Sequence, residues 1–233
     1  MTSRNVSKTV VKRLPVYLRI LDNLILRDVE IVSSRELSME SGFSAEQIRK
    51  DLAYFGAFGT RGTGYNTAYL RDKLLKIIGL DQKTKVIVIG AGHLGTALTR
   101  YNAVKNLYID IVAVFDRDRR VVGQQIGHIR VLPFEKAPEI IRKHQVKVAL
   151  ITVPETSAQK VVDEITRHGI TAILNFAPAK LHVPEDVHIQ NSDLTIDLQS
   201  LIYYSTAEKE RLSRLQKENE ESKTQKQKIL KID

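Results

Sequence analysis

The sequence predicts an α/β protein, with a small helical domain and a hairpin at its N-terminus and a doubly wound parallel sheet behind them. Apolar residues recur at helical spacing before residue 80, whereas short apolar runs alternate with helical segments after it. The length of 233 residues exceeds the roughly 100 to 200 residues of a typical domain. We therefore expect two domains that meet near residue 80.

Composition narrows the class of protein. No apolar run approaches the roughly 20 residues needed to cross a bilayer, and the polar N-terminus lacks the apolar stretch of a secretory signal. We expect a cytoplasmic protein with no membrane partner. Without Cys there is no disulfide, thiol catalysis or thiolate metal site, and we expect no bound metal. The net charge of +9 favours an anionic partner, most commonly nucleic acid.

The N-terminal domain is expected to begin with a helix that has Pro15 in its opening turn. Its apolar positions are Leu14, Tyr17, Leu18, Leu21, Leu24 and Ile25. Two short helices should follow, because Ser34 can cap the first, Gly42 can turn the chain and Ser44 can cap the second. A helix, a short turn with glycine and a second helix form the helix-turn-helix arrangement.

The second of these helices, AEQIRKDLAYF, would be the recognition helix. Gln47, Arg49 and Lys50 lie near its start, where such a helix meets bases and phosphates in the major groove, and Ile48, Leu52 and Phe55 would form its buried stripe. The glycine-rich GAFGTRGTGYN predicts a hairpin, or wing, with Arg61 at its tip, where arginine can enter a narrow minor groove. The alternative is a small helical oligomerisation domain.

Four buried parallel strands are expected after residue 80, each a short apolar run. They are KVIVIG at 85–90, IDIVAVFD at 109–116, VKVALITVP at 146–154 and ITAILNFAP at 170–178. The segment between the last two has helical periodicity, with Gly169 as its stop signal. This repetition of strand and helix predicts a Rossmann-type, doubly wound sheet.

A glycine loop after the first of these strands predicts a dinucleotide site. In GAGHLG, Gly90 would make the tight turn, Gly92 would let backbone approach a pyrophosphate and Gly95 would allow close helix packing. The whole loop, which we expect to line the site, is Gly90, Ala91, Gly92, His93, Leu94 and Gly95. The phosphates would sit at the N-terminus of the next helix. The alternative is a similar sheet that binds no nucleotide or another adenylated ligand.

Asp116 ends the second strand, where a carboxylate can bind both hydroxyls of the adenine ribose. That carboxylate should repel a 2′-phosphate and so favour NAD(H) over NADP(H). Nearby Arg117, Arg119 and Arg120 leave this preference open, because an arginine can pair with phosphate.

The ends of the last two strands are expected around the nicotinamide, because open α/β sheets bind ligands beyond the carboxyl ends of their strands. These residues are Thr152, Val153, Pro154, Asn175, Phe176, Ala177 and Pro178, for which simple strand termination by proline is the alternative. No histidine has a Lys or Asp at a spacing useful for hydride transfer, so we expect no catalytic residue and no enzyme. From residue 205 the chain is rich in Lys, Glu, Gln and Ser, which predicts a solvated helix that frays or a short coiled coil.

Several segments together resemble the Rex family of redox-sensing transcriptional repressors. They are RLPVYLRIL, QIRKDLAYFGAFGTRGTGY, GAGHLG, FD at 115–116, TVP, LNFAP and DLQSLIYY, and the resemblance covers residues 10–206. It implies a homodimer that binds a palindromic operator when NAD+ dominates and leaves the DNA when NADH binds. It also implies that the helix beginning near Asp193 is swapped between the subunits.

The resemblance also implies roles for single residues. Arg13, Arg49, Lys50, Arg61 and Gly62 would contact DNA, Tyr101 would lie near the nicotinamide, and Arg19 and Asp193 would be interdomain partners, with a helix cap as the alternative for Asp193. With those expected from helix position, the full DNA-binding set is Arg13, Ser44, Gln47, Arg49, Lys50, Tyr54, Arg61 and Gly62.

The chain departs from the family in two places. His93 stands where the family more often has Asn, and the polar tail has no usual counterpart. We expect a DNA-binding domain at 1–80, an NAD(H)-binding domain at 81–190, a swapped helix at 191–206 and the tail at 207–233. A small NAD-dependent dehydrogenase and a structural nucleotide-binding module, like the CoA-binding domains of ligases, remain as alternatives.

Overall fold

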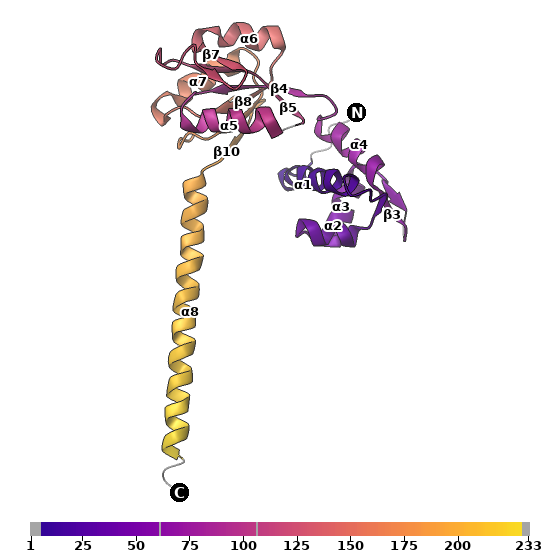
Figure 1. Ribbon diagram of the computed structural model, residues 1–233, viewed down its shortest axis with the longest axis vertical. Helices are drawn as coiled ribbons and strands as arrows, with labels where there is room; N and C mark the ends of the chain where they lie inside the picture. The colour runs from indigo at the N-terminus through magenta and orange to yellow at the C-terminus, as the bar shows by residue number, and fades with distance from the viewer. Residues whose placement is uncertain (1–5, 61, 106, 230–233) are drawn as a thin grey trace. The chain divides into compact units, whose positions relative to one another are not determined.

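The computed structural model describes residues 6–60, 62–105 and 107–229. The chain divides into two compact units, residues 1–86 with 100–112 and residues 87–99 with 113–233. The first contains the N-terminal helices and hairpin, and the second contains most of the sheet and the C-terminal helix (Figure 1). No helix of the described residues is both long and apolar enough to cross a membrane.

Helix α1 (Lys8–Ile25) begins earlier than its apolar pattern indicates. The Ser7 side chain caps it by accepting a hydrogen bond from the Val10 N–H, so Pro15 lies inside the helix and the expectation that it would lie in the opening turn is wrong. Pro15 is exposed, so the carbonyl group that its missing N–H leaves unbonded can meet water. The opposite face forms the core of the unit through Leu14, Tyr17, Leu18, Ile20, Leu21 and Leu24.

Helices α2 (Ser34–Ser41) and α3 (Ala45–Phe55) form the expected helix-turn-helix. Gly42 turns the chain with φ of 74°, and Ser44 caps α3, as the sequence predicts. The cap of α2 is Ser33 rather than Ser34, because the Ser33 hydroxyl accepts from the Glu36 N–H and the Glu36 carboxylate accepts from the Ser33 N–H, which completes a capping box. On α3, Ile48 and Leu52 are buried and Phe55 is half-buried.

The predicted wing is a hairpin that follows α3, and it belongs to a three-stranded sheet with the order β1-β3-β2. Strands β2 (Gly59–Thr60) and β3 (Gly64–Asn66) form its hairpin, and β1 (Ile31–Val32) pairs antiparallel with β3. A Cβ atom at Gly59 would lie 2.5 Å from the Gly64 carbonyl oxygen, so the close pairing of the two strands requires glycine here. Helix α4 (Thr67–Ile78) then packs against α1. Arg61 lies outside the described residues.

A seven-stranded sheet with the order β10-β9-β8-β4-β5-β7-β6 confirms the doubly wound architecture. Strands β5 and β7, β8 and β9, and β9 and β10 pair in parallel, whereas β6 pairs antiparallel with β7. Chain order reverses between β4 and β8, so a ligand is expected beyond the carboxyl ends of these two strands. The strands are β4 (Thr84–Ile89), β5 (Ile109–Asp116), β6 (Gln125–Ile126), β7 (Ile129–Pro133), β8 (Val148–Ile151), β9 (Ala172–Asn175) and β10 (His188–Asn191).

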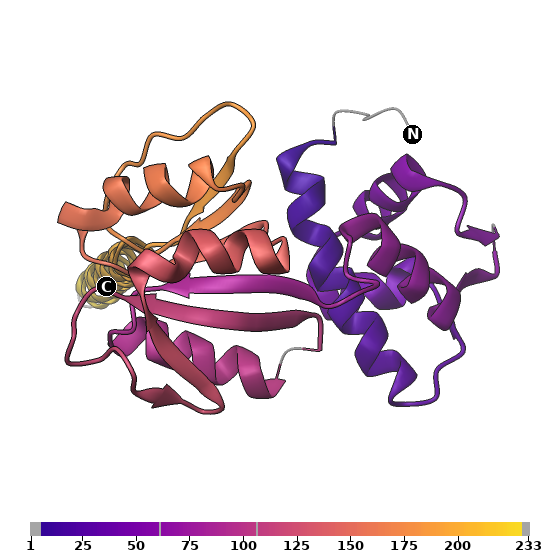
Figure 2. The ribbon, with the colours of Figure 1, turned by 90° about the horizontal axis from the view of Figure 1, so that it is seen from above.

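Helices cover both faces of this sheet. Helix α5 (His93–Lys105) lies on one face, and α6 (Ala137–His144) and α7 (Glu155–Arg167) lie on the other (Figure 2). Helix α7 ends two residues before Gly169, which has φ of 107° and turns the chain toward β9. The elements expected from the sequence did not include β1, α4, β6, β7, the short 3-10 helix η1 (Phe134–Lys136), α6 or β10.

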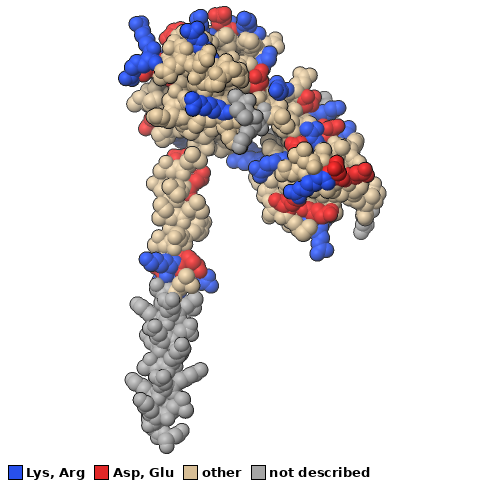
Figure 3. Space-filling model, in the orientation of Figure 1, with Lys and Arg blue, Asp and Glu red and all other residues tan. Residues whose placement is uncertain are grey.

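Helix α8 (Leu194–Ile229) continues through the segment that was expected to fray. Asp193 caps it, because its Oδ1 accepts hydrogen bonds from the N–H groups of Thr195 and Ile196 at 2.9 and 3.2 Å. The first turns carry exposed apolar side chains, and charged residues follow them along the helix (Figure 3). The exposed apolar residues are Leu194, Ile196, Leu198, Leu201, Ile202, Tyr203 and Tyr204, with Leu212 further along.

Candidate functional site

The glycine loop joins β4 to α5 at the switch point of the sheet. Gly90 has φ of 105°, and a Cβ atom there would lie 2.7 Å from the Thr152 carbonyl oxygen. A Cβ at Gly95 would lie 1.9 Å from the Gly90 carbonyl oxygen, so only glycine lets α5 start this close to the loop. A Cβ at Gly92 would have no heavy atom within 4 Å. Gly92 therefore leaves open space in front of the backbone, which a ligand could approach.

Asp116 fastens this loop to the end of β5. Its Oδ2 accepts a hydrogen bond from the Ala91 N–H at 2.7 Å, and its Oδ1 accepts one from the Asp118 N–H at 2.9 Å. The Thr152 hydroxyl holds β8 against the same turn, because its Oγ1 donates a hydrogen bond to the Gly90 carbonyl oxygen at 2.8 Å. The ends of three strands are thus fixed around one loop.

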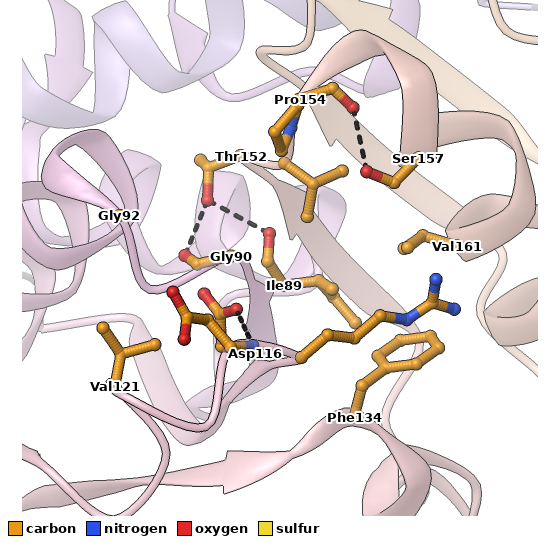
Figure 4. A pocket seen from close by; sticks show the side chains of 13 residues that line it. Ile89, Gly90, Gly92, Asp116, Val121, Phe134, Thr152, Pro154, Ser157 and Val161 are labelled. Carbon is orange, nitrogen blue, oxygen red and sulfur yellow. Dashed lines mark hydrogen bonds between the residues drawn. The ribbon is translucent and has the colours of Figure 1, made fainter.

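A cavity of about 540 Å³ opens at this point, which lies within the size range of small-molecule sites. The sequence-predicted residues that line it are Gly90, Gly92, Asp116, Thr152, Val153 and Pro154. The other lining residues, not predicted to bind, are Ile89, Arg117, Asp118, Val121, Phe134, Ser157 and Val161 (Figure 4). Asp118, two residues after Asp116, could have been found from the sequence. Phe134 could not, because it follows β7, a strand that the sequence analysis missed.

Arg117 and Phe134 form one wall of the cavity. The Arg117 guanidinium lies over the Phe134 ring, with its carbon 4.8 Å from the ring centroid. A cation over an aromatic face is attracted by the ring quadrupole. Asp118 is paired with exposed Arg120, and hydrogen bonds from the Arg120 side chain and backbone lower the pKa of Asp118 to about 2. The cavity therefore presents two carboxylates at the end of β5, and the second is already paired with a cation.

The remaining predicted nucleotide residues lie outside the lining of this cavity. His93 and Leu94 are exposed at the start of α5, and Tyr101 is exposed further along that helix. Asn175 is buried, and its Nδ2 donates to the Ala177 carbonyl and to Asn191 Oδ1, both at 3.0 Å. These bonds shape the turn after β9, which continues through Phe176, Ala177 and Pro178. A role of this segment and of Tyr101 toward the nicotinamide stays a prediction.

A second group of polar residues lies where α1 meets the recognition helix α3. The Asp51 side chain, only 1% exposed, accepts hydrogen bonds from Arg13 Nε at 2.6 Å and Arg13 Nη2 at 2.8 Å. The Tyr17 hydroxyl and Gln47 Nε2 each donate to it at 2.8 Å. Burial raises the pKa of Asp51, but these donors outweigh it and hold that pKa below its usual range.

The other predicted DNA contacts are more open. Arg49 and Lys50 are exposed on α3, with Arg49 Nη1 donating to Ser34 Oγ at 2.8 Å, and Tyr54 is 36% exposed. Ser44 is exposed and serves as the cap of α3, and Gly62 has φ of 88° in the hairpin. Lys and Arg side chains are interleaved with Asp and Glu on the visible face of the protein (Figure 3). Charge alone therefore does not mark a DNA-binding face.

Two predicted interdomain residues complete the set. Arg19 is exposed on α1, and Asp193 forms the cap of α8 described above. The cap accounts for Asp193 in this structure, and its pairing with Arg19 stays a prediction. Within residues 6–60, 62–105 and 107–229, no three His, Asp or Glu side chains gather as they would around a metal ion.

Comparisons with known proteins match both parts of the chain. A family model described as "CoA binding domain" matches residues 81–179, and one described as "Putative DNA-binding protein N-terminus" matches residues 5–53. The protein named redox-sensing transcriptional repressor Rex from Natranaerobius thermophilus is 59% identical over 200 residues, which is 86% of this chain and 91% of that protein.

Solved structures agree with these matches. A complex of the Rex-family repressor RSP with β-NAD+ and operator DNA has a TM-score of 0.82 and 38% identity, covering 92% of this chain and 98% of that one. A complex of RSP with β-NADH has a TM-score of 0.78 and 37% identity, covering 91% and 100%. Since a relative of such high identity spans most of the chain and the fold matches as well, the protein belongs to the Rex family of redox-sensing transcriptional repressors.

Proposed function

We propose that this protein is a repressor that binds a palindromic operator when NAD+ dominates and leaves it when NADH binds. The observation that carries this proposal is the presence in one chain of a recognition helix with a wing and of a glycine-loop cavity with a ribose-type carboxylate. Membership of a repressor family removes the two alternatives that the sequence left open, a dehydrogenase and a structural nucleotide-binding module. A DNA ligand also favours the cytoplasm as its location.

In the nucleotide half, residues 81–190, we assign the adenosine and pyrophosphate to the 540 Å³ cavity. Asp116 would accept hydrogen bonds from the ribose hydroxyls, and Gly92 would face the pyrophosphate at the N-terminus of α5. Tyr101 and the segments 152–154 and 175–178 would surround the nicotinamide. Because the Asp116 carboxylate would repel a 2′-phosphate at the ribose end, NAD(H) is favoured over NADP(H).

In the DNA half, residues 1–80, α3 would enter the major groove and the hairpin would reach the adjacent minor groove. Arg49 and Lys50 are the exposed cations for phosphate contact, and Gln47 and Arg13 are held close to the start of α3. Tyr54, Ser44, Arg61 and Gly62 complete the proposed set. Arg61 lies outside the described residues, so its role rests on the sequence alone.

We further propose that segment 191–206, which contains the end of β10 and the first turns of α8, is swapped between two subunits of a homodimer and is followed by a polar tail at 207–233. Support comes from the seven exposed apolar residues of α8 between Leu194 and Tyr204. Their side chains are 57% to 69% exposed in the single chain. Apolar surface of this extent is typical of an interface. NADH binding would then change the angle between the subunits and move the two recognition helices away from the spacing of successive major grooves.

The homodimer leads to a direct prediction. Leu201→Glu should convert the dimer into a monomer, because it places a charge in the apolar surface that the partner would cover. Sedimentation equilibrium should give twice the 26.4 kDa chain mass for the natural protein and about 26.4 kDa for the variant. Leu212→Glu is the matched control on the same helix, since it lies outside 191–206 and should leave the dimer intact. A dimeric Leu201→Glu protein would contradict the proposed interface.

An operator titration tests the function itself. We expect the protein to bind the operator duplex of the solved RSP complex tightly without nucleotide and with NAD+, and to release it with NADH, at one fixed salt concentration. By linkage, operator DNA should weaken NADH binding by the same factor. Fluorescence anisotropy of labelled DNA and of NADH emission measures both sides. Operator binding that does not change when NADH is added would rule out the proposed switch.

A further inference from the structure

The buried carboxylate of Asp51 has no part in the function described so far. It lies on the recognition helix, yet its four hydrogen bonds come from α1 and from the first turn of α3. A buried ion pair adds little net stability relative to packed apolar side chains, because the desolvation of both charges offsets their attraction. An acidic residue on a helix that approaches DNA also opposes binding to a polyanion. Neither folding stability nor affinity for DNA therefore explains a carboxylate at this position.

Two of the three donors to Asp51 are residues expected to contact the operator. Arg13 uses Nε and Nη2 for the carboxylate, so its third nitrogen, Nη1, and the second N–H of Nη2 are the donors that face away from this pair of bonds. Two adjacent guanidinium donors match O6 and N7 of guanine. The Arg13 guanidinium also lies 5.8 Å from the Phe43 ring centroid, and only 13% of its side chain is exposed, so its orientation is fixed.

Gln47 is held in the same way. Its Nε2 donates one hydrogen bond to Asp51 Oδ1, which fixes the rotation of the amide and leaves its carbonyl oxygen and its second N–H for another partner. An amide in this state can pair with adenine through N6 and N7. The Tyr17 hydroxyl holds the other carboxylate oxygen from the core, where Tyr17 packs edge-on against Phe43. The carboxylate is thus anchored by a hydroxyl from the core and holds the side chains of Arg13 and Gln47, both of which are partly exposed.

We propose that Asp51 is a positioning residue for base recognition, holding Arg13 and Gln47 in their reading orientation before the operator arrives. The proposal rests on the proposed DNA-binding function and adds which residues read bases. Fixing these side chains in advance removes an entropy loss that binding would otherwise include. The low pKa of Asp51 supports this role, because the carboxylate remains an acceptor throughout the physiological range. Asp51 thus acts on sequence discrimination, whereas Arg49 and Lys50 act on general affinity.

Asp51→Asn tests this role. Asparagine keeps the shape but turns one acceptor oxygen into a donor that faces other donors, so Arg13 loses its bidentate partner. Anisotropy titrations at one salt concentration would compare the operator duplex of the RSP complex with a scrambled duplex of equal length and composition. We expect operator affinity to fall about tenfold while scrambled-duplex affinity changes less than about twofold, because base contacts and not phosphate contacts are lost. NADH affinity should stay unchanged.

Asp22→Asn is the matched control. Asp22 pairs with Arg71 at 2.6 Å and with the Tyr108 hydroxyl at 2.7 Å in the same unit, but touches no predicted DNA contact. It should lower the melting temperature less than Asp51→Asn, because the Asp22 side chain is 26% exposed, and it should keep the ratio of operator to scrambled-duplex affinity. If Asp51→Asn weakens binding to both duplexes equally, or gives the same ratio of operator to scrambled-duplex affinity as Asp22→Asn, Asp51 is only structural and the proposal is overturned.

Arg13→Lys tests the proposed base recognition if the Asp51→Asn protein does not fold. Lysine keeps a positive charge beside Asp51 but lacks the guanidinium, which can donate to Asp51 and to a base at the same time. The ratio of operator to scrambled-duplex affinity should therefore fall while the fold is retained. An unchanged ratio in a folded Arg13→Lys protein would overturn the proposal. Natural protein that binds neither duplex would instead show that the proposed DNA-binding function is wrong, and the inference would be lost with it.

Discussion

Gly95→Ala is expected to abolish NADH binding and to destabilise the nucleotide-binding unit. The new Cβ would lie 1.9 Å from the Gly90 carbonyl oxygen and 2.6 Å from Thr152 Oγ1. Since the first of these atoms is backbone, relief requires α5 to move away from the loop. Overpacking of this kind costs about 3 kcal/mol, which lowers Tm by roughly 6 to 12 °C in a chain of this size. Differential scanning calorimetry and NADH fluorescence would measure both effects.

Gly92→Ala separates folding from binding in the same loop. Its Cβ would meet no atom within 4 Å, so the fold should tolerate the methyl group and Tm should stay within about 1 °C. NADH affinity should still fall, because the methyl group would occupy the space through which the backbone approaches the pyrophosphate. A Gly95→Ala protein that melts and binds NADH like the natural one would contradict the close packing, and a Gly92→Ala protein with unchanged affinity would remove the pyrophosphate from this loop.

Asp116→Ala is expected to lower NADH affinity about 100-fold, because two hydrogen bonds from ribose hydroxyls to a charged acceptor are lost. The substitution also leaves the N–H groups of Ala91 and Asp118 without the acceptor that holds the loop against β5. Discrimination against NADPH should weaken at the same time, since the charge that repels a 2′-phosphate is gone. Isothermal titration with NADH and NADPH measures both changes.

Asp110→Ala is the control for this prediction. Asp110 lies on the same strand but is exposed at its opposite end, so nucleotide affinity should not change. Operator binding without nucleotide should persist in both variants, while release by NADH should require far more NADH in Asp116→Ala. Unchanged NADH affinity in that variant would remove Asp116 from the ribose site.

Local chemistry made several features of this chain predictable. The glycine loop follows a buried strand and precedes a helix, so the sequence alone indicates its turn and its role. Ser44 marks the start of α3 and Gly42 marks the end of α2, because caps and turns depend on residues only a few positions apart. Short elements with weak signals were missed, such as β7, where Ile129 and Val131 are buried and Arg130 between them is exposed. With β7 the wall of the cavity at Phe134 was missed as well.

The limits of the sequence are clearest in the N-terminal unit. Proline is typical of the first turn of a helix, but Pro15 lies inside α1, which Ser7 caps seven residues before Leu14, the first residue of the apolar pattern. Asp51 directly follows the charged residues Arg49 and Lys50 in QIRKDLAYF, and nothing local separates it from a solvated residue. Its partners Arg13 and Tyr17 are 38 and 34 residues away, so only the packing of α1 on α3 brings them together.

The sequence by itself determined the doubly wound sheet, the helix-turn-helix and the glycine loop with its carboxylate, because each depends on periodicity or on residues close along the chain. Only the tertiary structure decided that Arg13 and Gln47 are held by a buried acid, that Asp116 fastens the loop through Ala91, and that Phe134 walls the cavity. Apart from the bond between Gln47 and Asp51 within α3, these contacts join segments far apart in the chain. Burial and hydrogen-bond partners are properties of the packed fold rather than of any local pattern.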